Sequence, residues 1–343
     1  MGTTESPAWT AADVADGDWV IGLDPTHQNE LVAAVAATAS VPIDQLSLDQ
    51  VELPTLSPEL RRAHRHVVNG RGFVLLRDVP VHRLDREGSI RAYVICGLHL
   101  GTPVSQNAKG HLVGHVKDLG NDPLDPVTRI YTTTFRQRFH TDSCDIVALL
   151  CLQTAKEGGR SAICSSTAVV AELERTRPDL VSVLEQPFVY DRKGEVPVGE
   201  GPWYEMPVVH RHDGFVTVIY ARDFIDAAAE RFPDVATLSP VQLEALDAFD
   251  ELCSDPRFRI EMDLRPGDVQ FIHNHQVLHA RSEYVDHDDV DEKRHLVRLW
   301  LSAHDARPLP AIFERRYGPI RPGRVRGGIR VPGGRLTTPL EAE

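Results

Sequence analysis

The sequence lacks long apolar runs, has few cysteines and aromatic residues, and carries no excess of positive charge. No apolar stretch approaches the ~20 residues that a membrane-spanning helix needs, and the first residues lack the basic-then-apolar pattern of a secretory signal. The formal charge is −13, without a broad basic stripe, which argues against binding to a nucleic-acid backbone. We therefore expect a cytoplasmic protein whose partner is a small molecule, with neither a membrane nor a nucleic acid as partner.

Five cysteines are too few and too scattered for a disulfide framework, and the sequence has no C-x-x-C zinc knuckle. Cys151 and Cys164 stand among apolar or small residues, so we expect buried thiols in a reducing compartment. Cys144 lies two residues after Asp142, and we expect it to have a neutral packing role.

The chain has 343 residues, with no internal repeat and no low-complexity linker. We expect a flexible N-terminus over residues 1–20 and a single domain over residues 21–343. Two stretches, about 105–130 and 191–206, are polar or rich in Gly and Pro and are typical of lids or binding loops.

The C-terminal tail concentrates arginine and glycine. We expect it to pack back over the acidic body or near the mouth of a pocket, and contact with RNA is the alternative. Its arginines are Arg315, Arg316, Arg321, Arg324, Arg326 and Arg330.

Helix-start signals precede two segments. Ser57 and Pro58 predict a helix over residues 58–69, with Ser57 as the N-cap and Pro58 in the first turn. Ser239, Pro240 and Gln242 form a capping box at the start of a second helix.

A candidate metal site begins at His140-Thr141-Asp142. His140 and Asp142 are two residues apart, so in an extended chain they project to the same side. The run Ile146–Leu152 is continuously apolar and predicts a buried strand beside them. Two imidazoles and one carboxylate can hold one face of an octahedral Fe(II), which leaves three positions for a co-substrate and O2. Alone, the tripeptide also fits a surface histidine beside an ordinary acid.

The downstream half of the site is patterned as strands. Residues 257–264 alternate strictly and predict a half-exposed strand, and Pro266-Gly267-Asp268 predicts a tight turn. A second strand over residues 269–272 then runs into three histidines that compete for one ligand role. Spacing alone leaves the choice open among His273, His275 and His279.

The segment 294–302 predicts a further strand, in which Arg294, Leu296, Arg298 and Trp300 share one face. Two arginines on such a face are costly to bury unpaired, so at least one of them needs an anion. A guanidinium can pair in a bidentate fashion with a dicarboxylate such as 2-oxoglutarate. The alternative is a pair of salt bridges to the acidic run over residues 286–292.

Together these motifs resemble the TauD/TfdA-like Fe(II)/2-oxoglutarate-dependent oxygenases and the neighbouring clavaminate synthase-like amino-acid hydroxylases. The resemblance covers roughly residues 70–305, in the family's order. The matching pieces are Phe139-His140-Thr141-Asp142, Glu157-Gly158-Gly159-Arg160-Ser161, Pro266-Gly267-Asp268, Asn274, Leu278-His279-Ala280-Arg281 and Arg294-His295-Leu296-Val297-Arg298-Leu299-Trp300.

The resemblance implies a mainly β fold with flanking helices, a double-stranded β-helix (jelly roll). It also implies Fe(II), 2-oxoglutarate as co-substrate and O2. By resemblance the iron ligands are His140, Asp142 and His279, because His279 fills the Leu-His-x-Arg position.

The co-substrate residues also follow from the resemblance. Arg294 matches the arginine that pairs with the distal carboxylate of 2-oxoglutarate. The family usually has Gly-Gly-Asp-Thr, whose threonine also contacts 2-oxoglutarate. Here Ser161 keeps the hydroxyl, while Arg160 replaces the acid.

Arg298 matches the arginine that in some members reaches an anionic substrate group. Gln106 and Asn107 resemble a polar pair that lines the pocket in relatives, although both could equally be turn formers. Arg222 follows an alternating strand over residues 215–219 and could face the pocket or begin a solvated helix. The expected substrate-binding residues are Arg298, Gln106, Asn107, Arg222, Trp203 and Tyr204.

The expected reaction is hydroxylation of a small molecule coupled to decarboxylation of 2-oxoglutarate to succinate. An amino acid, a carboxylate or a natural-product intermediate is the expected substrate. Desaturation, epoxidation and cyclisation need no different ligands, whereas Asp142 disfavours halogenation because halogenating relatives lack this carboxylate. The alternatives are a zinc hydrolase with the same ligands, which lacks H-E-x-x-H and leaves Arg294 and Arg298 idle, or a non-catalytic jelly-roll binding protein.

Overall fold

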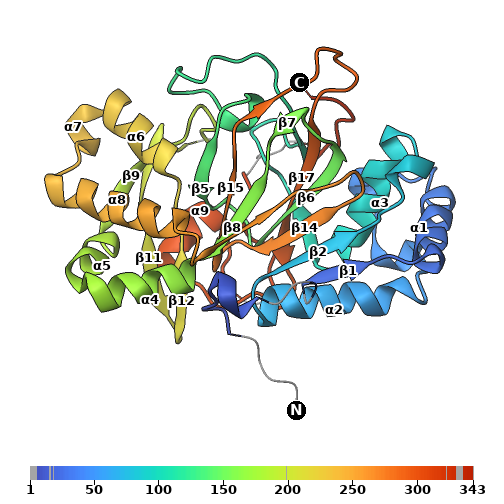
Figure 1. The fold of residues 1–343 in the computed structure, drawn as a ribbon, viewed down its shortest axis with the longest axis horizontal. Coiled ribbons are helices and arrows are strands. Elements are labelled where there is room, and N and C mark those ends of the chain that lie inside the picture. The colour runs from blue at the N-terminus through green and yellow to red at the C-terminus, as the bar shows by residue number, and fades with distance from the viewer. Residues whose placement is uncertain are drawn as a thin grey trace.

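The computed structural model describes residues 6–14, 17, 19–197, 199–321, 323–329 and 335–342. Two sheets form the centre of the molecule, with helices on both sides (Figure 1). The larger sheet has the order β1 (Val20–Gly22), β2 (Phe73–Arg77), β14 (Val269–His273), β6 (Ile146–Gln153), β17 (His295–Ala303), β3 (Gly101–Val104), and β4 (Val113–Val116) also pairs with β17. The smaller sheet has the order β13 (Arg259–Met262), β8 (Ser161–Ser165), β15 (Val277–Arg281), β5 (Gln137–His140).

Within the described residues, three further pairs of strands form antiparallel ribbons. They are β9 (Pro187–Asp191) with β10 (Trp203–Pro207), β11 (Val209–His212) with β12 (Phe215–Val218), and β7 (Glu157–Gly158) with β16 (Tyr284–Val285).

The helices lie in two groups on opposite sides of the sheets (Figure 1). Beside the larger sheet are α1 (Pro25–Ala37), α2 (Leu56–Asn69) and α3 (Arg86–Leu98). On the other side are α4 (Ser166–Thr176), α5 (Pro178–Leu184), α6 (Arg222–Arg231), α7 (Pro233–Ala236) and α8 (Pro240–Ser254), and α9 (Glu314–Tyr317) follows β17. Short 3-10 turns are η1 (Ala11–Asp13), η2 (Ile43–Gln45), η3 (Leu48–Gln50), η4 (Val81–Arg83), η5 (Ile130–Thr132) and η6 (Ala311–Phe313).

The side chains of β17 separate by parity between two cores. Val297 and Leu299 pack in the core under α1, α2 and α3, whereas Leu296 and Trp300 pack in the core between the two sheets. This arrangement confirms the predicted alternation, because successive side chains of a strand point to opposite faces. Arg298 shares the parity of Leu296, so the strand aims it at the interior, and Arg294, which directly precedes the strand, is also buried.

The predicted helix starts have different outcomes. At α8 the Ser239 hydroxyl accepts a hydrogen bond from the Gln242 amide, as the capping box predicts. The start of α2 at Ser57 is wrong, since the helix begins at Leu56 after Thr55. The Glu30 carboxylate accepts hydrogen bonds from the amides of Thr55 and Leu56, which satisfies the helix end from another element.

The two expected lid stretches contain regular structure. β4 lies within residues 105–130 and pairs antiparallel with β17, and its two valines are buried. Residues 191–206 are mostly the connection between β9 and β10 and the start of β10, so this insert is part of a ribbon.

Within residues 1–20, which we expect to be flexible, Trp9 contacts the body of the protein. The Trp9 indole is buried, lies tilted against Phe73 with ring centroids 5.1 Å apart, and donates to the Arg71 carbonyl. All five cysteines are buried thiols without disulfides. Across the described residues, no helix is long and apolar enough to span a membrane.

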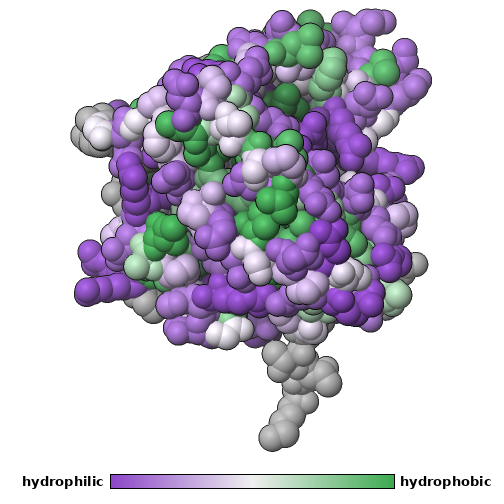
Figure 2. All heavy atoms as spheres, turned by 90° about the vertical axis from the view of Figure 1, so that its left-hand side faces the viewer, coloured by the Kyte–Doolittle hydropathy of each residue, from purple (hydrophilic) through white to green (hydrophobic). Residues whose placement is uncertain are grey.

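The C-terminal segment folds back onto the body. The amides of Gly328 and Ile329 donate to the carbonyls of Ser143 and Ser105, and the buried Arg326 side chain pairs with Asp145. Arg330 lies outside the described residues. The surface over α5, α6, α7 and α8 is largely hydrophilic with smaller hydrophobic areas (Figure 2).

Candidate metal centre

Strands β5 and β15 bring three potential metal ligands together. His140 and His279 are register partners, and their ring centroids are 4.1 Å apart. The carboxylate of Asp142 lies 4.0 Å from His140 Nε2 and 3.9 Å from His279 Nε2. One ligand atom from each residue can be chosen so that all three lie within 4.8 Å of one another. This donor set fits one face of an octahedral Fe(II).

Neighbouring groups hold two of these side chains in position. Asn274 accepts a hydrogen bond from the Asp142 amide and donates to the Asp142 carbonyl, which pins the backbone. The Trp300 indole donates to Asp142 Oδ2 at 2.8 Å. His140 Nδ1 lies 2.9 Å from the Arg138 carbonyl, which favours the tautomer that leaves Nε2 as a lone-pair donor.

The protonation states suit a metal site. Burial opposes ionisation of Asp142, but Arg298 and the two imidazoles outweigh it and lower the pKa of Asp142 to about 2. Burial and the neighbouring His140 lower the pKa of His279 to about 3. At neutral pH the site therefore offers a carboxylate and a neutral imidazole, the forms that bind metals.

The structure separates the three downstream histidines. His273 ends β14 in the larger sheet, while His279 lies in β15 of the smaller sheet. His275 stands between these strands, with its Nε2 2.9 Å from the buried carboxylate of Asp145. His273 and His275 therefore lie outside the metal group.

Arg294 directly precedes β17, and its side chain is buried and only partly hydrogen-bonded. Its guanidinium lies over the ring of Tyr284 at 5.1 Å, and its Nη1 has no hydrogen-bond partner among the described residues. Asp286 accepts from the backbone amide of Arg294. The expected alternative, a salt bridge from the Arg294 guanidinium to the acidic run over the described residues 286–292, is not formed. A buried guanidinium with an unsatisfied N–H fits an anionic co-substrate.

Gly158 lies against the backbone of Glu283, and Gly159 makes room for Arg294. Both have positive φ, and a Cβ at Gly159 would lie 3.0 Å from Arg294 Nε. Ser161 pairs with Arg281 across β8 and β15 and is buried. Arg281 was given no role from the sequence, although the Leu-His-x-Arg motif contains it. The guanidinium carbon of Arg281 lies 4.7 Å from the ring centroid of Tyr284, the same ring that Arg294 contacts.

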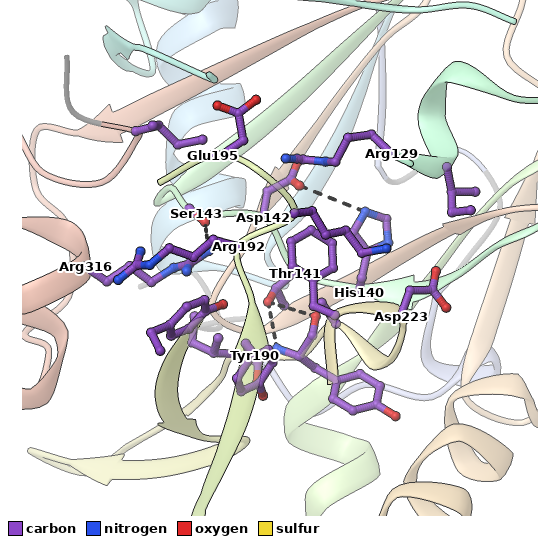
Figure 3. A pocket seen from close by; sticks show the side chains of 18 of the residues that line it. Arg129, His140, Thr141, Asp142, Ser143, Tyr190, Arg192, Glu195, Asp223 and Arg316 are labelled. Atoms are coloured by element: carbon purple, nitrogen blue, oxygen red, sulfur yellow. Dashed lines mark hydrogen bonds and ion pairs between the residues drawn. The ribbon is translucent and has the colours of Figure 1, made fainter. Parts of the chain in front are cut away.

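A cavity of about 220 Å³ opens beside His140 and Asp142 (Figure 3). Its walls come from β5, from the β9–β10 ribbon through Tyr190 and Tyr204, from residues 128–131, and from α9. Arg298 and Trp300 of β17 also line it, whereas Arg294 and Ser161 do not.

Gln106 positions Arg298 and does not line the cavity. Its Oε1 accepts from Arg298 Nε at 2.8 Å, and its Nε2 donates to the Arg298 carbonyl at 2.8 Å. Arg298 also lies 3.5 Å from the Asp142 carboxylate and over the ring of Tyr131. The guanidinium is thereby fixed beside the metal group.

Of the other expected substrate-binding residues, some line the cavity and some do not. Tyr204 lines the cavity, but Trp203 points to the other face of β10, where it packs against the core around Val189 and Ala228. This separation follows from strand alternation. Asn107 lies outside the cavity lining and forms a turn, accepting from the amides of residues 109 and 111.

Arg222 lines the cavity, but protein carboxylates match its charge. It pairs with Asp226 at 2.7 Å, Asp247 at 2.8 Å and Asp250 at 3.3 Å. Such a network satisfies the guanidinium without a substrate.

Comparison with known proteins agrees with this site. The model of the taurine catabolism dioxygenase TauD, TfdA family matches residues 36–300. An FR-33289 synthase of Streptomyces rubellomurinus (strain ATCC 31215) is 32% identical over 332 residues, covering 92% of this chain and 95% of that protein. A uridine-5'-phosphate dioxygenase of an Amycolatopsis species is 27% identical over 197 residues, which cover 53% of this chain and 66% of that protein.

Among solved structures, the fold is similar to that of an asparagine oxygenase in complex with Fe(II), 3-hydroxyasparagine and succinate. The TM-score is 0.62 at 18% sequence identity, and the match covers 83% of this chain and 94% of that one. The likeness shows the double-stranded β-helix fold.

Proposed function

The chain belongs to the TauD, TfdA family of dioxygenases, and on that premise we propose that His140, Asp142 and His279 hold its iron. The protein is an Fe(II)- and 2-oxoglutarate-dependent oxygenase that hydroxylates a small molecule. When bound, iron supplies the oxidising chemistry, with O2 as oxidant and 2-oxoglutarate converted to succinate and CO2. The observation that carries the ligand proposal is the convergence of the three side chains within 4.8 Å.

The residues around the iron would orient its ligands. Asn274 hydrogen-bonds to the backbone of Asp142, and Trp300 donates to its carboxylate. The Arg138 carbonyl sets the tautomer of His140. Such outer contacts fix ligand orientation and basicity.

Arg294 is the proposed partner of the distal carboxylate of 2-oxoglutarate. Its buried, unsatisfied N–H supports this role, and Ser161 would add a hydroxyl from β8. The proposed organisation is one oxygenase domain over residues 21–343, with the β9–β10 ribbon and residues 105–130 covering the cavity.

The proposed substrate is a small molecule with an acidic or zwitterionic group. The fixed Arg298 guanidinium in the cavity supports this proposal. The asparagine oxygenase and the uridine-5'-phosphate dioxygenase are named after an amino acid and a nucleoside phosphate, and both of these compounds carry an anionic group. Arg298→Gln should then weaken substrate binding much more than 2-oxoglutarate binding, measured as separate dissociation constants.

The ligand proposal is tested by metal analysis of protein purified without oxygen. His140→Ala, Asp142→Ala and His279→Ala should each lose most bound Fe(II) and turnover. His273→Ala should keep the iron, because this histidine ends a strand of the other sheet. His275→Ala should also keep it, with folding checked by circular dichroism because His275 contacts the buried Asp145. Loss of iron in the His275 variant with retention in the His279 variant would overturn the assignment, and zinc in place of iron would favour a hydrolase.

A further inference from the structure

We propose that Arg192 and Arg316 form a second anion subsite in the cavity, which binds a doubly charged, phosphate-type group of the substrate. The inference deepens the proposed function and rests on it, because the ligand is taken to be the molecule that the oxygenase oxidises. The subsite is distinct from Arg298, which lies on β17 next to the metal group.

The two guanidinium groups meet over one aromatic ring. Arg192 follows β9 and Arg316 lies in α9, yet their guanidinium carbons are 5.1 Å and 4.1 Å from the ring centroid of Tyr204. Arg316 also donates to the Ser143 hydroxyl. Figure 3 shows Arg192 and Arg316 next to one another beneath Ser143, on the cavity wall.

Protein carboxylates neutralise only part of the charge of this pair. Arg192 has a relative exposure of 8% and contacts Glu200 at 3.1 Å, but Glu200 also accepts from Arg315 at 2.9 Å. No carboxylate lies within 4.0 Å of Arg316 in the part of the chain that the structure describes. The Nε atoms of Arg192 and Arg316 are both buried without a hydrogen-bond partner among the described residues.

Arg192 is buried and Arg316 is half-buried, and both carry a buried N–H group without a hydrogen-bond partner among the described residues. Such cations are costly to bury unless an anion pairs with them. The cation–π contacts with Tyr204 offset only part of this cost. The arrangement therefore favours an anionic ligand that accepts hydrogen bonds from both guanidiniums.

The charge of the whole cavity points the same way. Eight Arg and Lys side chains line it, against four Asp and Glu side chains, although the chain carries a net charge of −13. Bound Fe(II) would add two positive charges. A cationic cavity in an acidic protein concentrates field lines on anionic ligands and keeps cationic molecules out.

Three other cations in the cavity wall already have partners in the protein. Arg222 has three carboxylates, and Arg138 pairs with Asp223 and Asp226. Lys193 donates to the carbonyls of residues 126 and 128. Arg129 lies over the rings of Tyr131 and Phe224. Arg192 shares Glu200 with Arg315, and no carboxylate lies within 4.0 Å of Arg316 among the described residues, so the inference rests on these two residues.

The geometry favours a phosphate-type group over a carboxylate. A tetrahedral dianion presents three oxygens and two charges, so it can accept paired N–H donors from both arginines and a third hydrogen bond from Ser143. A carboxylate has two oxygens and one charge. Ser143 follows Asp142 directly, and consecutive Cα atoms are about 3.8 Å apart. The subsite therefore adjoins the metal group, and a short substrate would reach both.

The test uses inorganic phosphate as probe, titrated by calorimetry into the metal-free full chain at a pH where phosphate is mainly a dianion. Arg192→Gln and Arg316→Gln should each weaken phosphate binding at least about tenfold, the loss of a charge-assisted hydrogen bond. The matched control is Arg175→Gln, which removes the same charge from the exposed surface of α4 and should leave phosphate binding unchanged. Acetate should bind the wild type at least about tenfold more weakly than phosphate.

Unchanged phosphate affinity in both variants would overturn the proposal, as would acetate binding as tightly as phosphate. Loss of phosphate binding only in Arg294→Ala would place the anion at the co-substrate arginine and would also overturn it. Arg316→Lys, which keeps the charge but not the paired N–H geometry, serves if the glutamine variant does not fold. Fe(II) and 2-oxoglutarate binding are measured separately, so failure of the oxygenase assignment is distinguishable from failure of the subsite.

Discussion

At the scale of single residues, the proposed binding of 2-oxoglutarate depends most on the buried guanidinium of Arg294. Removing it with Arg294→Ala should raise the apparent requirement for 2-oxoglutarate strongly, since a charge-assisted hydrogen bond contributes about 1.5–3 kcal/mol. The measurement is the KM for 2-oxoglutarate alongside its dissociation constant. Equal values in the wild type and this variant would rule out the role.

Ser161→Ala should change the same constants in the same direction but less. A single neutral hydrogen bond contributes roughly 1 kcal/mol, so the expected effect is about fivefold. Arg175→Ala is the control, because its side chain pairs with Glu172 on the surface of α4. A larger increase in these constants for Ser161→Ala than for Arg294→Ala would contradict the assignment of Arg294 as the main partner of 2-oxoglutarate.

The residue scale also shows the limit of pattern reasoning. His273, His275 and His279 have the same parity, so alternation along a strand places all three on one side. The chain leaves the larger sheet after His273 and enters the smaller sheet at Val277, which separates them. Pairing between β15 and β5, set by distant sequence, puts His279 opposite His140. The sequence could not predict that Arg192 and Arg316 lie together, because no local pattern joins the loop after β9 with α9.

At the scale of elements, the turn between β7 and β8 is fitted to the arginine beside it. Gly159→Ala would place a Cβ 3.0 Å from Arg294 Nε and should weaken 2-oxoglutarate binding. Gly120→Ala is the matched control, because Gly120 has a similar φ of +74° but nothing within 4 Å of its Cβ position. Both substitutions carry the left-handed strain of about 1–2 kcal/mol. Only the Gly159 variant should change the 2-oxoglutarate dissociation constant, and equal effects on both would refute a role for the close approach.

Elements with a clear local sequence pattern were predicted correctly, whereas elements that depend on contacts with distant segments of the chain were not. The alternation of β17 and the capping box of α8 are local properties of the chain, and both are confirmed. β4 lies in a polar stretch, and its pairing with β17 rather than its own sequence makes it a strand. Likewise, α2 begins at Leu56 because Glu30 of α1 satisfies its first amides.

At the scale of the whole molecule, one buried ion pair ties the C-terminal segment to the metal-bearing body. Asp145 accepts from Arg326 at 2.9 Å, from His275 at 2.9 Å, and from the Ala303 amide at 3.1 Å. The same segment supplies Gly328 and Ile329 to the cavity wall. Sequence composition indicated a tail that packs on the body, but it gave no means of pairing Arg326 with Asp145, which are 181 residues apart.

Arg326→Met should therefore destabilise the fold by about 3–5 kcal/mol at neutral pH, because Asp145 would remain buried without its cationic partner. Arg324→Met is the control, since Arg324 is exposed in the same segment and its loss should change stability little. The measurement is the free energy of unfolding from urea titrations of the three proteins.

The pH dependence separates this mechanism from a loss of packing. In the wild type, burial raises the pKa of Asp145, but His275 and Arg326 outweigh burial and lower it below its usual 3.8. A lowered pKa in the folded state contributes stability above pH ~4, and this contribution is lost as the pH falls through the folded pKa. Without Arg326, burial gains weight and the pKa of Asp145 rises, so the variant carries a penalty at neutral pH that shrinks on acidification as the carboxyl is protonated. The difference in unfolding free energy between wild type and Arg326→Met should thus be largest near pH 7 and decrease toward pH ~4. A difference that stays constant over this range would mean that Arg326 stabilises the segment by packing and not through the charge of Asp145.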